Sequence, residues 1–207
     1  MPLHDIIEKN HCRIGLWDIS ESQEELMHLV SLSKEEKITL ENFKGAKRRA
    51  QWLAVRALLP LIADAETCSV DYDELGKPFL NQQQAISISH SENMVAIQLC
   101  FSDFCGVDIQ KFSEKMSRLA SKFINEKENT FIPQEHCLEY YNLIWTMKEA
   151  IFKNFGSDLE FKRQIEISSF EMNAAGSTTA RVVHHNKIYS IGLEWRRIGE
   201  YFLTYLC

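Results

Sequence analysis

The middle of the chain changes its hydrophobic period, and this pattern restricts the fold to a mixture of strands and helices. Residues 86–90 read Ile-Ser-Ile-Ser-His, an alternation of apolar and polar side chains that predicts a half-buried strand. Residues 94–99 and 105–110 predict two further strands. Two stretches of helical period follow, one opened by Ser113 and one over about 138–155. We therefore expect an α/β (α+β) fold.

The helical regions carry recognisable start and stop signals. Residues 33–62 predict a helix that starts at Ser33, has Glu36 at the capping-box position and ends before Pro60. The helix over 138–155 has an apolar stripe and a glycine stop. The stripe is Ile144, Met147, Ile151 and Phe155, and the stop is Gly156.

The last part of the chain predicts strands over residues 165–205, with turns near 175–177 and 185–187. With 207 residues, the chain suits one large domain or two small subdomains that share a core. Its apolar fraction of 45% is ordinary for a globular protein and argues against disorder.

Charge and cysteine usage exclude several classes of function. A net charge of -6 argues against a general nucleic-acid binder. No apolar run approaches the roughly 20 residues of a membrane helix, and the first residues do not resemble a secretory signal. No CxxC pair is present, which argues against a zinc site, and reduced thiols in the cytoplasm are expected. The cysteines stand at positions 12, 68, 100, 105, 137 and 207.

Glu149 and Lys153 are the first candidates for chemistry. Because they are four residues apart on a predicted helix, they project from one face, with Trp145 one turn earlier. An isolated Glu–Lys pair at this spacing is commonly only a solvated ion pair. The alternative is a metal-binding carboxylate beside a phosphate-binding cation, because Mg²⁺ prefers one or two carboxylates together with phosphate oxygens.

Asp108 stands in the third predicted strand. Period-two geometry puts Asp108 and Gln110 on one face of that strand, and Val107 and Ile109 on the other. A carboxylate in a mostly apolar strand is seldom buried without a partner. Asp108 therefore either caps a turn at the strand end or faces Glu149 as a second metal ligand.

Basic and hydroxyl side chains precede these carboxylates. Ser89 and His90 end a predicted strand with donors suited to an anion, and no GxSxG motif makes a hydrolase elbow there. Arg56 interrupts an apolar stretch, and guanidinium groups suit phosphate. Each of these residues also has an ordinary explanation that involves no anion. Lys77 could be a lysine in a turn, His90 could be structural, and the basic residues could form a solvated helix face. That face would carry Lys47, Arg48, Arg49 and Arg56. Carboxylates for a cation and cations for phosphates together are the equipment of phosphoryl-type chemistry.

Four segments, taken in order, resemble the motifs of the phosphopantetheinyl transferase superfamily. They are Gly76-Lys77-Pro78, Ser87-Ile88-Ser89-His90, Gly106-Val107-Asp108-Ile109-Gln110, and Trp145 to Lys153 (Trp-Thr-Met-Lys-Glu-Ala-Ile-Phe-Lys). The length is similar to that of the longer, surfactin-synthetase type, and the basic segment 47–56 extends the match. The resemblance implies a pseudo-dimer of two similar α/β subdomains, residues 1–103 and 104–207, with coenzyme A in the cleft between them.

The resemblance also implies roles for single residues. Asp108 and Glu149 would hold Mg²⁺ together with the pyrophosphate of coenzyme A, and Lys153 would contact the phosphate under attack. The adenosine end and its 3′-phosphate would be held by Arg49, Arg56, Lys77, Ser89 and His90. Gln110 departs from the pattern, because many members carry Glu there, and an amide is a weaker Mg²⁺ ligand. Glu128 resembles a family glutamate of less certain role.

The implied reaction moves phosphopantetheine from coenzyme A to a serine of an acyl or peptidyl carrier protein and releases 3′,5′-adenosine bisphosphate. Glu149, directly or through a water on the metal, would accept the serine proton. One alternative is a magnesium-dependent nucleotide kinase or phosphohydrolase, but the GxxxxGK[ST] cradle is absent. Another is a non-catalytic coenzyme A or carrier-protein binding module. Since a pseudo-dimer needs no second copy, we expect a monomer. From the net charge and the lack of a long apolar run, we expect neither nucleic-acid nor membrane partners.

Overall fold

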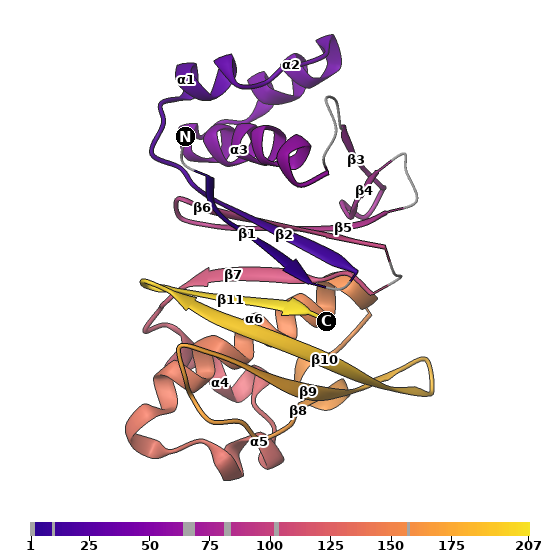
Figure 1. Cartoon of the computed structure of the whole chain (residues 1–207). Coiled ribbons are helices and arrows are strands. Elements are labelled where there is room, and N and C mark those ends of the chain that lie inside the picture. The colour runs from indigo at the N-terminus through magenta and orange to yellow at the C-terminus, as the bar shows by residue number, and fades with distance from the viewer. Residues whose placement is uncertain (1–2, 10, 64–68, 81–83, 102–103, 157) are drawn as a thin grey trace. The chain divides into compact units, whose positions relative to one another are not determined.

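The fold is described from a computed structural model over residues 3–9, 11–63, 69–80, 84–101, 104–156 and 158–207 (Figure 1). The chain divides into two compact units, Met1–Asp103 and Phe104–Cys207. Each unit contains an antiparallel sheet with helices packed against it, so the predicted α/β class is confirmed.

The N-terminal unit is built on a four-stranded sheet in the order β1-β2-β6-β5, in which every neighbouring pair is antiparallel. A short hairpin, β3-β4, stands beside it as a separate two-stranded sheet. The helices α1, α2 and α3 lie on one face of the larger sheet (Figure 1). The elements are β1 (Leu3–Lys9), β2 (Cys12–Asp18), α1 (Gln23–His28), α2 (Lys34–Asn42), α3 (Ala46–Ala63), β3 (Val70–Tyr72), β4 (Pro78–Leu80), β5 (Ala85–Ser91) and β6 (Met94–Cys100).

The predicted helix over 33–62 is two helices in the structure. Ser33 and Glu36 form the expected capping box at the start of α2. The chain then leaves the helix at Phe43, which is extended, and α3 begins after Gly45. The predicted stop before Pro60 is wrong, because α3 continues to Ala63. Proline costs that helix one backbone hydrogen bond, but the fully buried core side chains of its last turns hold it in place.

The core of the N-terminal unit lies between α3 and the sheet. Gly15 in β2 allows the closest approach, because a Cβ there would stand 2.6 Å from Ile62 Cγ2 of α3. Alternate side chains of β5 and β6 pack into the same core. The buried members on these elements include Leu53, Leu58, Ile62, Ile86, Val95, Ile97 and Leu99. Lys77 lies in the turn of the hairpin and His90 at the end of β5, both exposed and outside this core.

The C-terminal unit is built on a five-stranded sheet in the order β7-β11-β10-β9-β8. The long helix α6 packs on β7 and β11, and α4 packs on α6. The elements are β7 (Val107–Lys111), α4 (Met116–Phe123), α5 (Glu126–Phe131), the 3₁₀ turn η1 (Gln134–His136), α6 (Cys137–Phe155), α7 (Phe161–Gln164), β8 (Ile165–Ile167), β9 (Ala175–His184), β10 (Lys187–Ile198) and β11 (Tyr201–Leu206).

Both turns that the sequence predicts fall in the part of the chain that forms this sheet. The turn near 185–187 is confirmed, because His185 and Asn186 take positive φ values of 47° and 61° and connect β9 to β10. The turn near 175–177 is wrong, since those residues lie in β9. Gly176 serves a close approach there, because a Cβ would meet Trp195 Cζ2 at 2.3 Å. Gly199, with φ 56°, lies in the turn between β10 and β11.

The predicted helix over 138–155 is α6. Ile144, Met147 and Ile151 are fully buried in the core of the C-terminal unit, and Phe155 packs partly buried against it. Gly156 ends the helix with a φ of 108°, a value that glycine adopts without steric cost. The helix predicted from Ser113 begins later, at Met116, after a turn.

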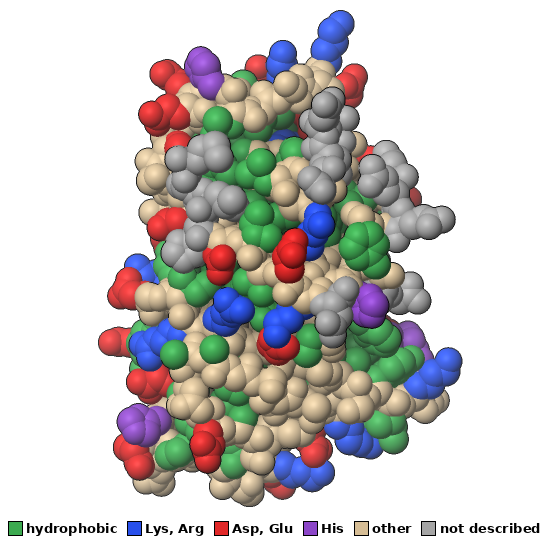
Figure 2. Space-filling view, in the orientation of Figure 1, with side chains coloured by type: hydrophobic (Ala, Val, Ile, Leu, Met, Phe, Trp, Pro, Cys, Tyr) green, Lys and Arg blue, Asp and Glu red, His purple; other side chains and the backbone are tan. Residues whose placement is uncertain are grey.

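None of the five cysteines in the described ranges is in a disulfide, and Cys68 lies outside them. No helix in those ranges is both long and apolar enough to cross a membrane. On the face drawn in Figure 2, acidic and basic side chains of the described residues are interspersed rather than gathered in one broad patch.

Candidate active site

The polar face of β7 is turned toward α6. Asp108 and Thr204 are direct cross-strand partners, so their side chains share one face of the sheet. Thr204 Oγ1 and Thr146 Oγ1 of α6 are 2.9 Å apart in a buried hydrogen bond, which shows that this face meets the helix. Val107 and Ile109 therefore point to the opposite face.

A glycine lets the strand approach the helix. Gly106, just before β7, lies so close to α6 that a Cβ would stand 2.1 Å from the backbone oxygen of Ala150. A larger residue would push the start of β7 away from the helix. Gly106 therefore helps to bring Asp108 within reach of side chains from the last turns of α6.

Lys153 forms its ion pair with Asp108 rather than with Glu149. Lys153 Nζ donates to Asp108 Oδ1 at 2.8 Å and to the Val107 carbonyl oxygen at 2.9 Å. The Asp108 side chain is 8% exposed and the Lys153 side chain is 25% exposed, so the pair is well shielded from water. The ordinary interpretation of Glu149 and Lys153 as a solvated pair along the helix is wrong.

Glu149 is a half-buried carboxylate next to this pair. Burial, and then the negative charge of Asp108, raise its pKa to about 7, although Lys153 acts in the opposite direction. The structure thus brings Asp108, Glu149 and Lys153 into one group. Such a group has two carboxylates that repel one another and a single cation that cannot neutralise both.

Gln110 lies two residues beyond Asp108 on the same face of β7. Its side chain is half-buried, and its Nε2 donates to the carbonyl of Lys111 at 3.2 Å. The amide oxygen is the atom of Gln110 that is chemically suited to a cation. Its assignment as a metal ligand stays a prediction.

Sequence reasoning missed a buried charge pair on the other side of α6. Lys148 is fully buried, and its Nζ contacts Glu128 at 2.8 Å. The same ammonium donates to three backbone carbonyls at 2.6–3.0 Å, those of Phe123, Phe161 and Ile165. Burial lowers the pKa of Lys148, and Glu128 opposes that shift. The sequence did contain a signal for a buried Lys148. It lies on the apolar stripe of the helix, four residues after Ile144 and three before Ile151.

The contacts of Glu128 indicate a structural role and argue against a catalytic one. Its carboxylate accepts from the backbone N–H of Asn125 at 2.9 Å and completes the capping box of α5. It also accepts from Ile167 N at 2.9 Å, so it joins α5, α6 and β8. With no exposed surface, Glu128 is placed to organise the core rather than to meet a substrate.

The residues predicted to hold the adenosine end of coenzyme A belong to the N-terminal unit. His90 is exposed at the end of β5 and contacts the guanidinium of Arg48, which was named only as part of the basic helix face. Ser89 is buried beside it in the strand. Lys77 is exposed in the β3-β4 turn, where its N–H donates to Asp73 Oδ1 at 2.8 Å. Arg48 and His90 are 42 positions apart, which explains why sequence spacing did not indicate their contact.

The two arginines of α3 that were assigned to coenzyme A make internal contacts. Arg56 Nε pairs with Glu36 Oε1 at 2.7 Å, and its guanidinium lies over the ring of Trp52. Arg49 Nε donates to the carbonyl of Phe43 at 2.8 Å and so braces the break between α2 and α3. The described contacts do not bring Arg56 together with His90 or Lys77.

Comparison with known proteins identifies the family. The family model described as the 4′-phosphopantetheinyl transferase superfamily matches residues 104–206, about half of the chain and nearly all of the C-terminal unit. The 4′-phosphopantetheinyl transferase HetI of Nostoc sp. is 26% identical over 186 residues, which cover 81% of this chain and 78% of that relative. The chain belongs to the 4′-phosphopantetheinyl transferase superfamily.

A second relative of this phosphopantetheinyl transferase is more similar over a shorter length. The 4′-phosphopantetheinyl transferase gsp of Aneurinibacillus migulanus is 30% identical over 101 residues, 47% of this chain and 40% of the relative. The segment that the family model matches contains Asp108, Gln110, Glu149 and Lys153. The residues predicted to hold the adenosine end of coenzyme A precede that segment in the transferase.

Proposed function

We propose that this phosphopantetheinyl transferase moves the 4′-phosphopantetheine arm of coenzyme A to a serine of an apo acyl or peptidyl carrier protein. The leaving product is 3′,5′-adenosine bisphosphate. The observation that carries the proposal is the group of Asp108, Glu149 and Lys153, which lies inside the segment matched by the family model. Carboxylates for a cation and an ammonium for a phosphate meet there on one face of α6.

The group fits a magnesium ion by the chemistry of its donors. Mg²⁺ takes oxygen ligands and commonly binds one or two carboxylates together with substrate phosphates. The charge of Asp108 helps to raise the pKa of Glu149, so the two carboxylates are near enough to repel one another. A divalent cation between them would remove that repulsion. We assign Asp108 and Glu149 as ligands, with the amide oxygen of Gln110 as a weaker third.

When bound, Mg²⁺ would neutralise charge on the pyrophosphate of coenzyme A and on the phosphoryl group in transfer. Lys153 uses two of its three N–H groups on Asp108 and on the Val107 carbonyl. Its third N–H has no acceptor among the described residues, and we assign it to an oxygen of the reacting phosphate. The Asp108 ion pair fixes the direction of the Lys153 side chain, so little rearrangement is needed as negative charge develops.

Glu149 is assigned as the acceptor of the serine proton. A general base works best with a pKa near the working pH, and the pKa of Glu149 without a bound cation is about 7. The alternative is that Glu149 only holds the metal, in which case its protonation controls metal binding instead.

We assign the adenosine end and the 3′-phosphate of coenzyme A to the N-terminal unit, through Arg49, Arg56, Lys77, Ser89 and His90. To these the structure adds Arg48, because it contacts His90. Exposed cationic donors suit a dianionic phosphate. Arg56 and Arg49 are the weaker assignments, since their guanidinium groups already serve Glu36 and Phe43.

The test is mass spectrometry of apo carrier proteins incubated with this protein, coenzyme A and Mg²⁺. Fatty-acid, polyketide and peptide-synthetase carriers form the panel. A gain of one phosphopantetheine on a carrier, lost with the Glu149→Gln variant, supports the proposal. If coenzyme A binds but no carrier gains mass, the chain is a binding module of the same family and the proposed activity is wrong.

A further inference from the structure

A second cluster of metal-ligand side chains lies in the C-terminal unit. Asp158 follows the end of α6, and His184 and His185 stand at the β9-β10 hairpin. His184 Nε2 is 3.0 Å from Asp158 Oδ1, and His185 Nε2 is 3.1 Å from Asp158 Oδ2. One potential ligand atom from each residue lies within 4.8 Å of the others. None of the three belongs to the group of Asp108, Glu149 and Lys153.

Two local backbone features create this cluster. Gly156 ends α6 with a φ of 108°, and two residues later Asp158 reaches the hairpin. Neighbouring residues of a strand normally point to opposite faces. His185 departs from that rule because its φ is 47°, in the left-handed region. Its ring therefore turns to the same side as that of His184, and the two ring centroids are 3.9 Å apart.

We propose that Asp158, His184 and His185 form a binding site for a divalent transition metal, with Zn²⁺ as the fitting ion. Zn²⁺ takes imidazole nitrogen at about 2.0–2.1 Å and carboxylate oxygen at about 2.0–2.2 Å in tetrahedral sites. Ligand atoms around such an ion are then roughly 3.4 Å apart, by the geometry of a tetrahedron with these bond lengths. The observed separations of 3.0 and 3.1 Å, each from one imidazole to a different oxygen of Asp158, are close to that value.

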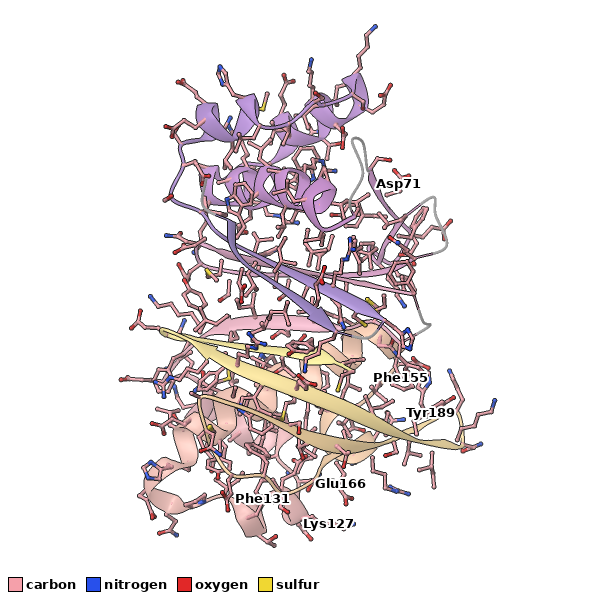
Figure 3. The ribbon with its side chains drawn as sticks, viewed as in Figure 1. Asp71, Lys127, Phe131, Phe155, Glu166 and Tyr189 are labelled. Atoms are coloured by element: carbon pink, nitrogen blue, oxygen red, sulfur yellow. The ribbon has the colours of Figure 1, made fainter. Side chains whose placement is uncertain are left out.

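Aromatic side chains cover the His184 side of the site, and the His185 side is open to solvent. His184 is 9% exposed, and its ring packs edge-on against Phe155 at 5.3 Å. Phe155 in turn packs against Tyr189, 5.0 Å away, and Figure 3 shows these two residues side by side at the end of α6. The His185 side chain is 72% exposed. Three protein ligands with an open side leave the fourth position for water or another small ligand.

The competing explanation is a carboxylate that only accepts hydrogen bonds from the two imidazoles. The contact with His184, above all, lowers the pKa of Asp158, as an accepted hydrogen bond would. That arrangement requires both Nε2 atoms to carry protons, whereas a metal takes the Nε2 lone pairs. The lack of a CxxC pair speaks only against a cysteine zinc site and leaves a His-His-Asp cluster possible as a ligand set.

The test is a cobalt titration of the full chain in saturating Mg²⁺, which keeps the Asp108–Glu149 group out of competition. We expect one Co²⁺ to bind with visible bands of tetrahedral symmetry and without a thiolate charge-transfer band. Addition of Zn²⁺ should displace it. His185→Gln and Asp158→Asn should each weaken binding at least about 100-fold, because losing a ligand should exceed the 10–100-fold effect of an outer-shell change.

The matched control is His136→Gln, since His136 is an exposed histidine on η1, outside the cluster. Zn²⁺ should raise the Tm of the wild type and of this control, but not that of His185→Gln. Equal Co²⁺ affinity in the wild type and His185→Gln would overturn the proposal. So would a cobalt spectrum with thiolate charge transfer, or the absence of any bound ion in saturating Mg²⁺.

Discussion

At the scale of single residues, the protonation of Glu149 should control activity. Its pKa is raised to about 7, mainly by burial and next by the charge of Asp108. Below that pH the carboxyl carries a proton and can neither accept one nor bind a cation. We therefore expect kcat/KM to fall as the pH drops through about 7. A bound cation favours the ionised form, so a pH profile at higher Mg²⁺ should show the fall at lower pH.

Glu149→Gln removes this group with little change of shape. It should nearly abolish transfer while coenzyme A still binds, as measured by calorimetry, and circular dichroism should show a folded protein. The fold should survive because Glu149 lies off the buried stripe of Ile144, Met147 and Ile151. Near-normal kcat in saturating Mg²⁺ would show that both the metal and the base assignments are wrong.

Lys153 should separate catalysis from metal binding. Lys153→Ala removes a donor to the reacting phosphate, so kcat should fall by roughly 100-fold or more, as for the loss of one strong transition-state donor. The same change leaves Asp108 and Glu149 without their shared cation. Their repulsion grows, and Mg²⁺ should therefore bind at least as tightly as before.

The control for this variant is Lys162→Ala, which changes an exposed lysine that contacts Ser121. Single-turnover rates and Mg²⁺ titrations of both variants make the comparison. If Lys153→Ala keeps the wild-type kcat, or if the Lys162 control loses as much, Lys153 does not act on the phosphate.

At the scale of secondary-structure elements, the pair of Lys148 and Glu128 should act on stability rather than on chemistry. Glu128→Gln leaves a fully buried ammonium without its counter-charge. Breaking a buried pair in this way costs about 3–5 kcal/mol. We expect the free energy of unfolding in urea to fall by that amount, and Lys148→Met in the same chain to recover part of it.

Glu126→Gln is the control, because Glu126 is exposed in the first turn of the same helix, α5. It should change the free energy of unfolding little. A Glu128→Gln protein that is as stable as this control, but has lost kcat, would return Glu128 to the list of catalytic candidates.

At the scale of the whole molecule, we expect the two units to divide binding from chemistry. Lys77→Ala should mainly raise the KM for coenzyme A, since uniform binding contacts affect KM and transition-state contacts affect kcat. Arg48→Ala should weaken coenzyme A more than its 3′-dephospho form, as measured by calorimetry. Arg56→Ala should also destabilise the N-terminal unit, because it breaks the contacts with Glu36 and Trp52.

Lys37→Ala is the control in this set, as Lys37 is exposed on α2 and has no assigned role. Its KM for coenzyme A should stay at the wild-type value. Equal weakening of coenzyme A and its dephospho form by Arg48→Ala would remove Arg48 and His90 from the 3′-phosphate site.

Local patterns were enough to predict much of the fold. Capping residues, strand alternation and a helical stripe are set by neighbours in the chain, so the start of α2, the strands β5 to β7 and the helix α6 were all expected. Local rules failed where distant residues compensate. Pro60 stays inside α3 because Leu59 and Ile62 near it are buried, and Gly176 fits under Trp195 rather than forming a turn.

In the candidate site, too, the sequence indicated the residue types, whereas their contacts depend on the tertiary structure. The types of its residues, Asp108, Glu149 and Lys153, were legible in the sequence, because carboxylates and a lysine at strand and helix positions are chemically distinctive. Their partners were decided only by the tertiary structure. A lysine on a helix has a carboxylate four residues away and another on a facing strand, and only the packing of β7 on α6 selects Asp108. The buried Lys148–Glu128 pair and the His-His-Asp cluster join residues 20 or more positions apart, beyond the range of any local pattern.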